Sequence, residues 1–184
     1  QGIDFSSDGL KMYMVGDGSN TIYQYGLTTA WDVSSTQPFD DNSWGVSTED
    51  VSPRGIFFKS DGTKMYVVGL GTDTVYQYAL STAWDVSTAS FETGKTKAVG
   101  TEDSSPWGIT FSSDGLKMYV MGSTSDTIYQ YGLTTEWDVS TASFTTGKTK
   151  AVSTEDGTPQ GIDFSSDGLK MYMVGDGSNT IYQY

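Results

Sequence analysis

Residues 111–133 read FSSDGLKMYVMGSTSDTIYQYGL. An Asp-Gly pair between two apolar runs is the strongest short-range signal for a β-hairpin, so strands are predicted on both sides of Asp114 and Gly115. The polar stretch 123–126 predicts a second turn, and 127–133 reads as a third strand. With a short apolar run at 108–111 before them and a more polar run at 143–152 after them, these segments predict a meander of four antiparallel strands.

This unit repeats along the whole chain. The segments GIDFSSDG, GIFFKSDG, GITFSSDG and GIDFSSDG start at Gly2, Gly55, Gly108 and Gly161, and each start lies 53 residues after the previous one. A fixed period of this length indicates a repeat architecture. Residues 1–25 and 160–184 are identical, which suggests an additional, longer period of three units.

Each repeat has the length and the strand number of one β-propeller blade. In KMYMV, Met12 and Met14 point to one face while Tyr13 and Val15 point to the other, so both faces are apolar, as expected for a sheet between two neighbours. The polar TGKTK segment suits the exposed outer edge of a blade. A parallel β-solenoid is the main alternative. We predict an all-β propeller of four-stranded antiparallel blades over residues 1–184, with blades at 2–54, 55–107 and 108–160 and a partial blade at 161–184.

The sequence contains three complete blades and part of a fourth, whereas propellers typically have about four to eight blades. We expect further blades of a longer chain, or further copies in a homo-oligomer, to complete the ring. Closure as a small four-bladed ring is the third option. Since the first residue is Gln, we expect a processed product, a fragment or part of a longer protein.

The quoted stretch 111–133 resembles the YVTN and NHL type of β-propeller repeat, whose core reads approximately F-S-P-D-G-x-x-L-Y-V. It is also similar to the uniform propeller arrays of some phage and secreted bacterial proteins, which implies an extracellular or virion-associated location. The resemblance covers every repeat, although the TAWDVSTAS connection is longer than in compact members of the family. The Trp-Asp pairs at Trp31, Trp84 and Trp137 lie in this connection without a Gly-His partner, so they are not read as a WD40 signature.

Composition excludes several function classes. The net charge of −13, from 23 acidic and 10 basic residues, disfavours nucleic acid as a partner. The absence of cysteine and histidine excludes disulfides, thiolate nucleophiles, imidazole bases and the usual zinc ligands. No segment approaches the roughly 18 apolar residues of a membrane-spanning helix, so no membrane partner is predicted.

The few positions at which the repeats differ are candidates for a site. They are the residue before the first glycine and the residue two positions after it, with further variation in the turn that begins at Asp17. The resemblance implies that first strands line the central channel, so we predict a binding face at its mouth for a carbohydrate or a protein. Trp107 would stack on the ligand, and Arg54 with Asp4 would orient its polar groups; neutral drift is the alternative. The predicted ligand-binding residues are Gln1, Asp4, Arg54, Phe57, Trp107, Thr110, Gln160 and Asp163.

Other carboxylates are read as structural. The aspartates of the SDG segments, Asp8, Asp61, Asp114 and Asp167, are predicted to hold the hairpin turns. The TED triplets that end at Asp50, Asp103 and Asp156 offer calcium ligands, but calcium requires six to eight oxygens, and two adjacent carboxylates do not establish a site. No metal site and no cofactor are predicted.

These features lead to the prediction of a non-catalytic binding or structural module. The alternative is a propeller hydrolase or lactonase, which this repeat type sometimes resembles. Such enzymes typically need a metal cage or histidine, and only carboxylate chemistry is available in this chain. An engineered or architectural repeat without a ligand is a third possibility.

Overall fold

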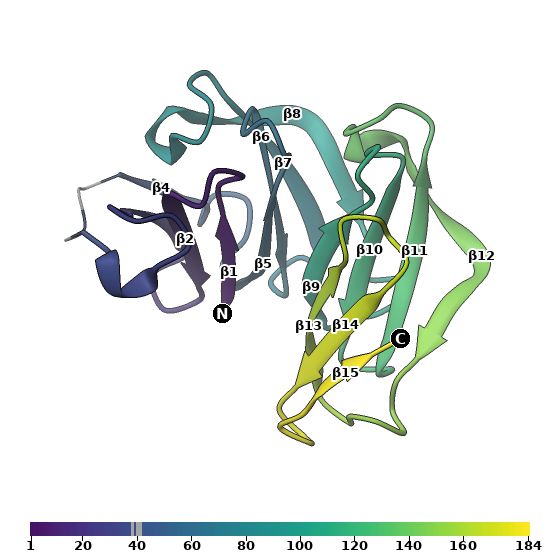
Figure 1. Cartoon of the computed structure of the whole chain (residues 1–184). Helices are drawn as coiled ribbons and strands as arrows, with labels where there is room; N and C mark the ends of the chain where they lie inside the picture. The colour runs from purple at the N-terminus through teal and green to yellow at the C-terminus, as the bar shows by residue number, and fades with distance from the viewer. Residues whose placement is uncertain (38, 40–41) are drawn as a thin grey trace.

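The computed structural model describes residues 1–37, 39 and 42–184, which form four antiparallel sheets arranged as an open fan (Figure 1). In the described chain, three sheets have four strands and the last has three, all in simple meander order. The first two sheets comprise β1 (Gly2–Phe5), β2 (Lys11–Gly16), β3 (Thr21–Gly26) and β4 (Ser43–Gly45), then β5 (Pro53–Phe58), β6 (Lys64–Gly69), β7 (Thr74–Leu80) and β8 (Ala89–Ala98). The last two comprise β9 (Pro106–Phe111), β10 (Lys117–Gly122), β11 (Thr127–Leu133) and β12 (Ala142–Ala151), then β13 (Pro159–Phe164), β14 (Met171–Gly175) and β15 (Ile181–Gln183). The prediction of propeller blades built from four-stranded meanders is confirmed.

The Asp-Gly turns form as the sequence predicts. At the turn between β9 and β10, the Asp114 carboxylate accepts hydrogen bonds from the Ser112 hydroxyl at 2.6 Å and from the Leu116 amide at 3.0 Å. Gly115 follows with a φ of +68°, a conformation that glycine adopts without a steric penalty. The aspartate and the glycine therefore act together to reverse the chain.

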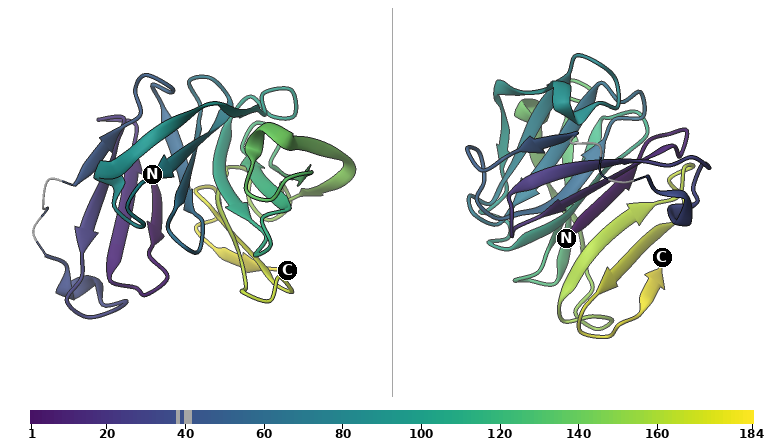
Figure 2. Two further views of the ribbon diagram at one scale, coloured as in Figure 1. Left: turned by 90° about the horizontal axis from the view of Figure 1, so that it is seen from above. Right: turned by 90° about the vertical axis from the view of Figure 1, so that its left-hand side faces the viewer.

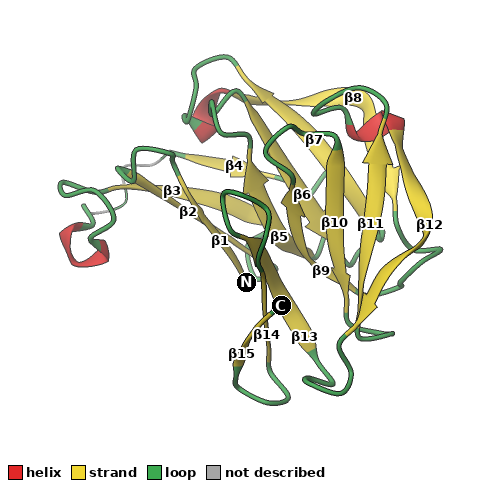
Figure 3. Ribbon diagram, turned by 45° about the vertical axis from the view of Figure 1, so that its right-hand side comes forward, coloured by secondary structure: helices red, strands yellow, loops and turns green. Residues whose placement is uncertain are grey.

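The long connection after the third strand contains a short 3₁₀ helix that the sequence pattern did not predict. Among the described residues there are three such helices, drawn in red in Figure 3: η1 (Val33–Ser35), η2 (Val86–Thr88) and η3 (Val139–Thr141). In the second repeat, Asp85 caps η2 by accepting from the Ser87 amide at 3.0 Å. The Trp84 amide donates to the Gly62 carbonyl at 3.0 Å, so the connection folds back over the hairpin turn.

The inner strands β1, β5, β9 and β13 lie beside one another at the centre of the fan, as the two views of Figure 2 show. The first glycine of each repeat permits this approach. A Cβ atom on Gly55 would lie 2.5 Å from the carbonyl oxygen of Trp107, and one on Gly108 would lie 2.6 Å from that of Gln160. A larger residue at these positions would push neighbouring sheets apart.

Sheets inside the fan are buried on both faces. In β6, Met65, Tyr66, Val67 and Val68 are all fully buried. In β2, Tyr13 is buried against the second sheet while Met14 is 42% exposed, because no described sheet covers that side. The two-faced apolar pattern is thus satisfied only where a strand lies between two sheets.

The outer strand β8 carries lysines that reach the following sheet. The Lys95 ammonium lies 2.6 Å from the Asp138 carboxylate, and the Lys97 ammonium lies 5.6 Å from the centre of the Tyr131 ring. These contacts link neighbouring blades at the outer edge.

None of the helices in the described residues has the length and apolar character required to cross a membrane.

Candidate functional site

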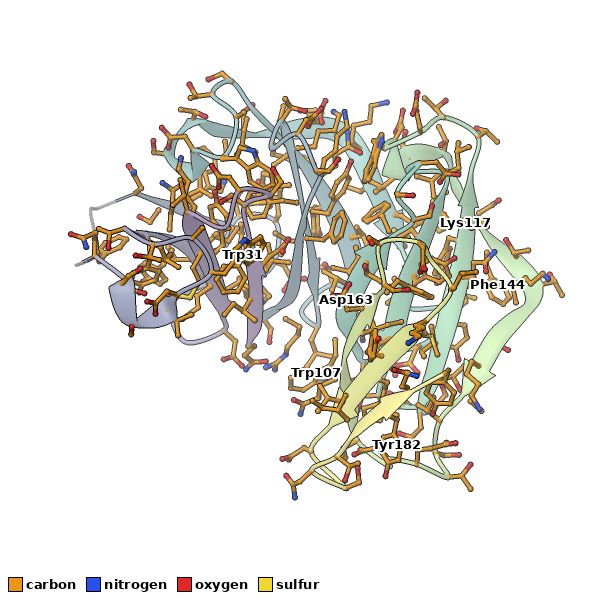
Figure 4. All side chains as sticks on the ribbon, viewed as in Figure 1. Trp31, Trp107, Lys117, Phe144, Asp163 and Tyr182 are labelled. Atoms are coloured by element: carbon orange, nitrogen blue, oxygen red, sulfur yellow. The ribbon has the colours of Figure 1, made fainter. Side chains whose placement is uncertain are left out.

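The inner strands border a pocket of about 490 Å³, here called the inner-strand pocket. It is lined by residues of β1, β5, β9 and β13, together with a few residues of β14 and β15. Trp107 and Asp163, which are labelled in Figure 4, lie on two of these strands. All eight residues proposed from repeat variation line this pocket: Gln1, Asp4, Arg54, Phe57, Trp107, Thr110, Gln160 and Asp163.

Asp4 is the most strongly perturbed carboxyl group of the pocket. Burial raises the pKa of Asp4 to about 6; the amides of Phe58 and Phe5 oppose this rise, and the negative charge of Asp163 adds to it. The Asp4 carboxylate accepts from the Phe58 amide at 2.8 Å and from the Phe5 amide at 2.7 Å. A carboxyl group with a pKa near neutrality can exchange a proton at physiological pH, which is the property required of a general base or acid.

Asp163 occupies the equivalent position of the last sheet but has a different environment. It is exposed and accepts from the amide of Phe164 at 2.8 Å. Both aspartates line the same pocket, so two carboxyl groups of different exposure face one space. Of the two, Asp4 is the one whose raised pKa suits it to exchange a proton.

Arg54 connects three sheets across the rim of the pocket. Its guanidinium forms an ion pair with Asp17 at 2.7 Å, donates to the side-chain carbonyl of Gln1, and lies 4.5 Å from the centre of the Trp107 ring. The charge of Arg54 is balanced by Asp17, and the Arg54 guanidinium lies over one face of the Trp107 ring. The roles of Arg54, Asp4 and Trp107 in ligand binding stay predictions.

The roles of Phe57 and Thr110 are mainly in packing. The Phe57 ring lies 5.1 Å from that of Phe111 and 6.3 Å from that of Trp137, which makes it part of the contact between the second and third sheets. Thr110 is 2% exposed. Phe57 and Thr110 occupy, in the two middle repeats, the position that Asp4 and Asp163 occupy in the first and last. In the described pocket lining, carboxyl groups therefore come from the first and last inner strands alone.

Asp17 is a site residue that the predicted set omitted. It lies in the turn between β2 and β3, and its partner Arg54 is 37 residues away in sequence. The variation of this turn among repeats was the available signal. The pairing could not be predicted, because it depends on how two sheets are placed in space.

The TED aspartates organise turns. Asp103 is 5% exposed and accepts from the amides of Ser105, Thr124 and Ser125 at 2.8, 3.2 and 2.9 Å, and from the Ser125 hydroxyl at 2.6 Å. In the same arrangement at Asp156, burial would raise the pKa, but the hydrogen bonds from Ser178, Thr158 and Gly177 together outweigh it and lower the pKa of Asp156 to about 2. In residues 1–37, 39 and 42–184, no group of three or more acidic, cysteine or histidine side chains lies close enough to hold a metal ion.

Comparison with known proteins identifies the family. The model of the lactonase family of seven-bladed β-propellers matches residues 45–184. The chain belongs to this family. None of the curated proteins has a significantly matching sequence.

Solved structures share the fold at low sequence identity. A proposed 6-phosphogluconolactonase from Bacteroides fragilis superposes with a TM-score of 0.63 at 15% identity, over 98% of this chain and 49% of that one. The periplasmic gluconolactonase of Pseudomonas aeruginosa superposes with a TM-score of 0.59 at 14% identity, over 98% of this chain and 48% of that one. A nidogen–laminin complex matches with a TM-score of 0.61 at 15% identity, over all of this chain and 59% of that one. The chain thus spans about half the length of the structures that it matches.

These findings contradict the prediction of a non-catalytic module. The matching family is named for an enzyme, and two of the similar structures are described as lactonases. The prediction relied on the absence of histidine and of a distinctive carboxylate pair. Sequence could not reveal that burial in this pocket raises the pKa of Asp4.

Proposed function

We propose that this chain is part of a propeller hydrolase that opens the cyclic ester of a sugar lactone in the inner-strand pocket. The proposal rests above all on the match of residues 45–184 to the lactonase family model. The names of the similar structures, which include gluconolactonase, support the substrate class. We also propose that the repeat is of the YVTN or NHL type, on the basis of the F-S-x-D-G core at 111–115.

Asp4 is the proposed general base. In this step the Asp4 carboxylate removes a proton from a water molecule as the water oxygen attacks the lactone carbonyl carbon. The bond from that carbon to the ring oxygen then breaks, and the ring oxygen takes the proton held by Asp4 to become a hydroxyl group, which returns Asp4 to its carboxylate form. The products are a carboxylic acid and an alcohol in one open-chain molecule.

The charges of the pocket favour an uncharged lactone over a phosphorylated one. Asp4 and Asp163 both line it, and the one guanidinium among its lining residues, that of Arg54, is already paired with Asp17. A phosphate group would meet two carboxyl groups without a free cationic partner in the described part of the pocket, and that arrangement is repulsive.

Hydrolysis of glucono-δ-lactone, corrected for spontaneous opening, tests the proposal. Replacement of Asp4 by Asn is expected to lower kcat/KM by about 100-fold or more, because the general base is lost. Asp176→Asn is the matched control, because Asp176 is an exposed aspartate outside the pocket lining. Equal activity of Asp4→Asn and the unaltered chain would contradict the assignment of Asp4.

The pH profile provides a second test. Activity is expected to rise with pH through a midpoint near 6, as Asp4 loses its proton. The Asp163→Asn variant is expected to move this midpoint downward, because the charge of Asp163 contributes to the raised pKa of Asp4. An unchanged midpoint would argue against the coupling of the two carboxyl groups.

A further inference from the structure

The turns β2–β3, β6–β7 and β10–β11 end on asparagine in one repeat and on aspartate in two. Asn20 holds this position in the first repeat, and Asp73 and Asp126 hold it in the second and third. Their φ angles are +50°, +50° and +48°, a left-handed conformation that asparagine and aspartate tolerate better than most residues. The backbone of the turn therefore accepts either residue, and the two side chains differ in their hydrogen-bonding chemistry.

Asn20 shows which groups surround the side chain at this position. With its amide oriented so that the nitrogen faces them, Asn20 donates to the Asp17 carbonyl at 3.0 Å and to the Val51 carbonyl at 2.9 Å. Asp17 belongs to the same turn, whereas Val51 lies in the connection that leads into β5. The Asn20 side chain thus ties the first sheet to the connection into the second.

The main chain follows the same course in the other two turns. The carbonyl of Asn20 accepts from the amide of a valine at 2.8 Å, and the carbonyls of Asp73 and Asp126 do the same at the same distance. The positions equivalent to Asp17 and Val51 are Leu70 and Ser104 in the second repeat and Ser123 and Gly157 in the third. Repeat equivalence therefore places two backbone carbonyls opposite the side chain of each aspartate.

An aspartate at this position supplies an acceptor where the surroundings require a donor. The Oδ1 atoms of Asp73 and of Asp126 are shielded from solvent and have no hydrogen-bond partner. The Asp73 side chain packs against the connection into β9, because a Cβ atom on Gly100 would lie 2.9 Å from the Asp73 Cβ atom. An ionised carboxyl group has only acceptors, so burying it opposite carbonyl oxygens is unfavourable.

The nearest charged groups also oppose the ionisation of Asp73. Burial raises the pKa of Asp73, and the carboxylates of Asp50 and Asp103 raise it further. These two carboxylates lie in the connections before and after the second sheet, where they accept hydrogen bonds from turn amides. Asp103 and Asp156 stand at the equivalent places around Asp126.

The other charged groups of these connections are engaged in contacts of their own. Glu49 and Glu102 accept from the hydroxyl groups of Tyr78 at 3.3 Å and Tyr131 at 3.0 Å. The Lys97 ammonium, near the end of β8, lies over the Tyr131 ring. The same residue types recur in the repeat around Asp126, as Glu155, Tyr184 and Lys150.

We propose that Asp73 and Asp126 form proton-dependent contacts between blades. In its protonated form each carboxyl group has one O–H, which donates to a backbone carbonyl of the turn or of the connection into the next blade. Loss of the proton removes this donor and leaves acceptors facing one another, which weakens the contact. Acid thus strengthens these two contacts, whereas the amide of Asn20 does not titrate. The inference does not depend on the proposed hydrolase activity.

Urea denaturation of the 184-residue chain at several pH values tests the proposal with Asp73→Asn, Asp126→Asn and the double variant. Each carboxyl group holds its proton to a higher pH in the folded state than in the unfolded state, so the unaltered chain loses stability as the pH rises above about 4. The variants lack this loss. Relative to the unaltered chain, the unfolding equilibrium constant of each single variant is expected to fall about tenfold between about pH 4 and 8. This ratio cancels the contribution of other titrating groups, including Asp4.

Asn20→Asp is the reciprocal variant. It places a carboxyl group opposite the Asp17 and Val51 carbonyls and is expected to introduce the same pH dependence at the first contact, with a loss of stability that grows as the pH rises. Glu136→Gln, which removes a negative charge from an exposed position of the third repeat, is the charge-matched control. Its unfolding constant relative to the unaltered chain is expected to be independent of pH.

Two results would overturn the proposal. A gain in stability of Asp73→Asn and Asp126→Asn that is equal at low and high pH would show that the carboxyl groups hold no proton. Stabilisation of the unaltered chain by calcium chloride at high pH, absent from the double variant, would show that a metal cation and not a proton lies between the oxygens. Because asparagine is native at this position in the first repeat, the variants are expected to fold, and circular dichroism checks this.

Discussion

Removal of the hydrogen bond between the Tyr66 hydroxyl and the Trp137 carbonyl tests how much a direct contact between blades adds to the free energy of unfolding. The Tyr66 hydroxyl donates at 2.8 Å in a buried environment, and Tyr66 itself is fully buried. Replacement by Phe removes the hydroxyl and leaves the ring in place. The Trp137 carbonyl then loses its donor, which costs about 1–3 kcal/mol when the group left behind is buried. This loss corresponds to a roughly 5- to 150-fold rise in the unfolding equilibrium constant.

Tyr172→Phe is the matched control, because Tyr172 has the same place in its repeat but no following blade in the described chain. This variant is expected to change stability by no more than about 0.5 kcal/mol. Guanidinium denaturation followed by tryptophan fluorescence measures both variants against the unaltered chain. Equal losses in the two variants, or no loss at Tyr66, would refute the reasoning, because the effect would then not arise between blades.

Three further substitutions test the packing and electrostatics of the fold. Gly55→Ala is expected to destabilise by about 1–3 kcal/mol in urea denaturation, because its Cβ would lie 2.5 Å from the Trp107 carbonyl; Gly26→Ala, with no atom within 4 Å, is expected to be neutral. Asp103→Ala is expected to lower the thermal midpoint and cost about 2–4 kcal/mol, since it leaves several turn amides without an acceptor, and a midpoint shift below 1 °C would contradict this. Asp4→Asn tests the raised pKa of Asp4. Between pH 4 and 6, the Asp4 carboxyl group keeps a proton in the folded state that it has lost in the unfolded state. The unaltered chain therefore loses stability as the pH rises through this window. The variant is therefore expected to gain up to about 2–3 kcal/mol relative to the unaltered chain between pH 4 and 8, and parallel pH curves would exclude the shift.

Local features of the fold were predictable because their causes are local. The Asp114 turn requires only residues 112–116, since the carboxylate and the left-handed glycine act within one hairpin. The strand boundaries at 117–122 and 127–133 follow from alternating side chains in an extended backbone. The 3₁₀ helix after each Trp-Asp pair was not predicted, because a single turn capped by one aspartate has no periodic signal.

The sequence indicated residues that line the pocket, but it did not indicate their partners or the pKa of Asp4. Repeat comparison selected eight residues that line one pocket, because variable positions at the same place in each repeat lie together when the repeats stack. The partner of Arg54 and the face of Trp107 that it covers depend on three sheets meeting at one rim. The raised pKa of Asp4 depends on burial, which a carboxyl group acquires only after the second sheet packs against the first. The prediction of a non-catalytic module, which the family match contradicts, judged reactivity by residue type alone.

Sequence by itself determined the repeat, the strands and the two-faced apolar pattern of each sheet, since these depend on side-chain order within about 50 residues. Only the tertiary structure decided which faces are covered, because identical sequences at 1–25 and 160–184 are buried on opposite sides. A residue's exposure depends on its neighbours in space, and the two end sheets have different neighbours. The same physical reason places Asp4 and Asp163, which share one sequence context, in different electrostatic environments.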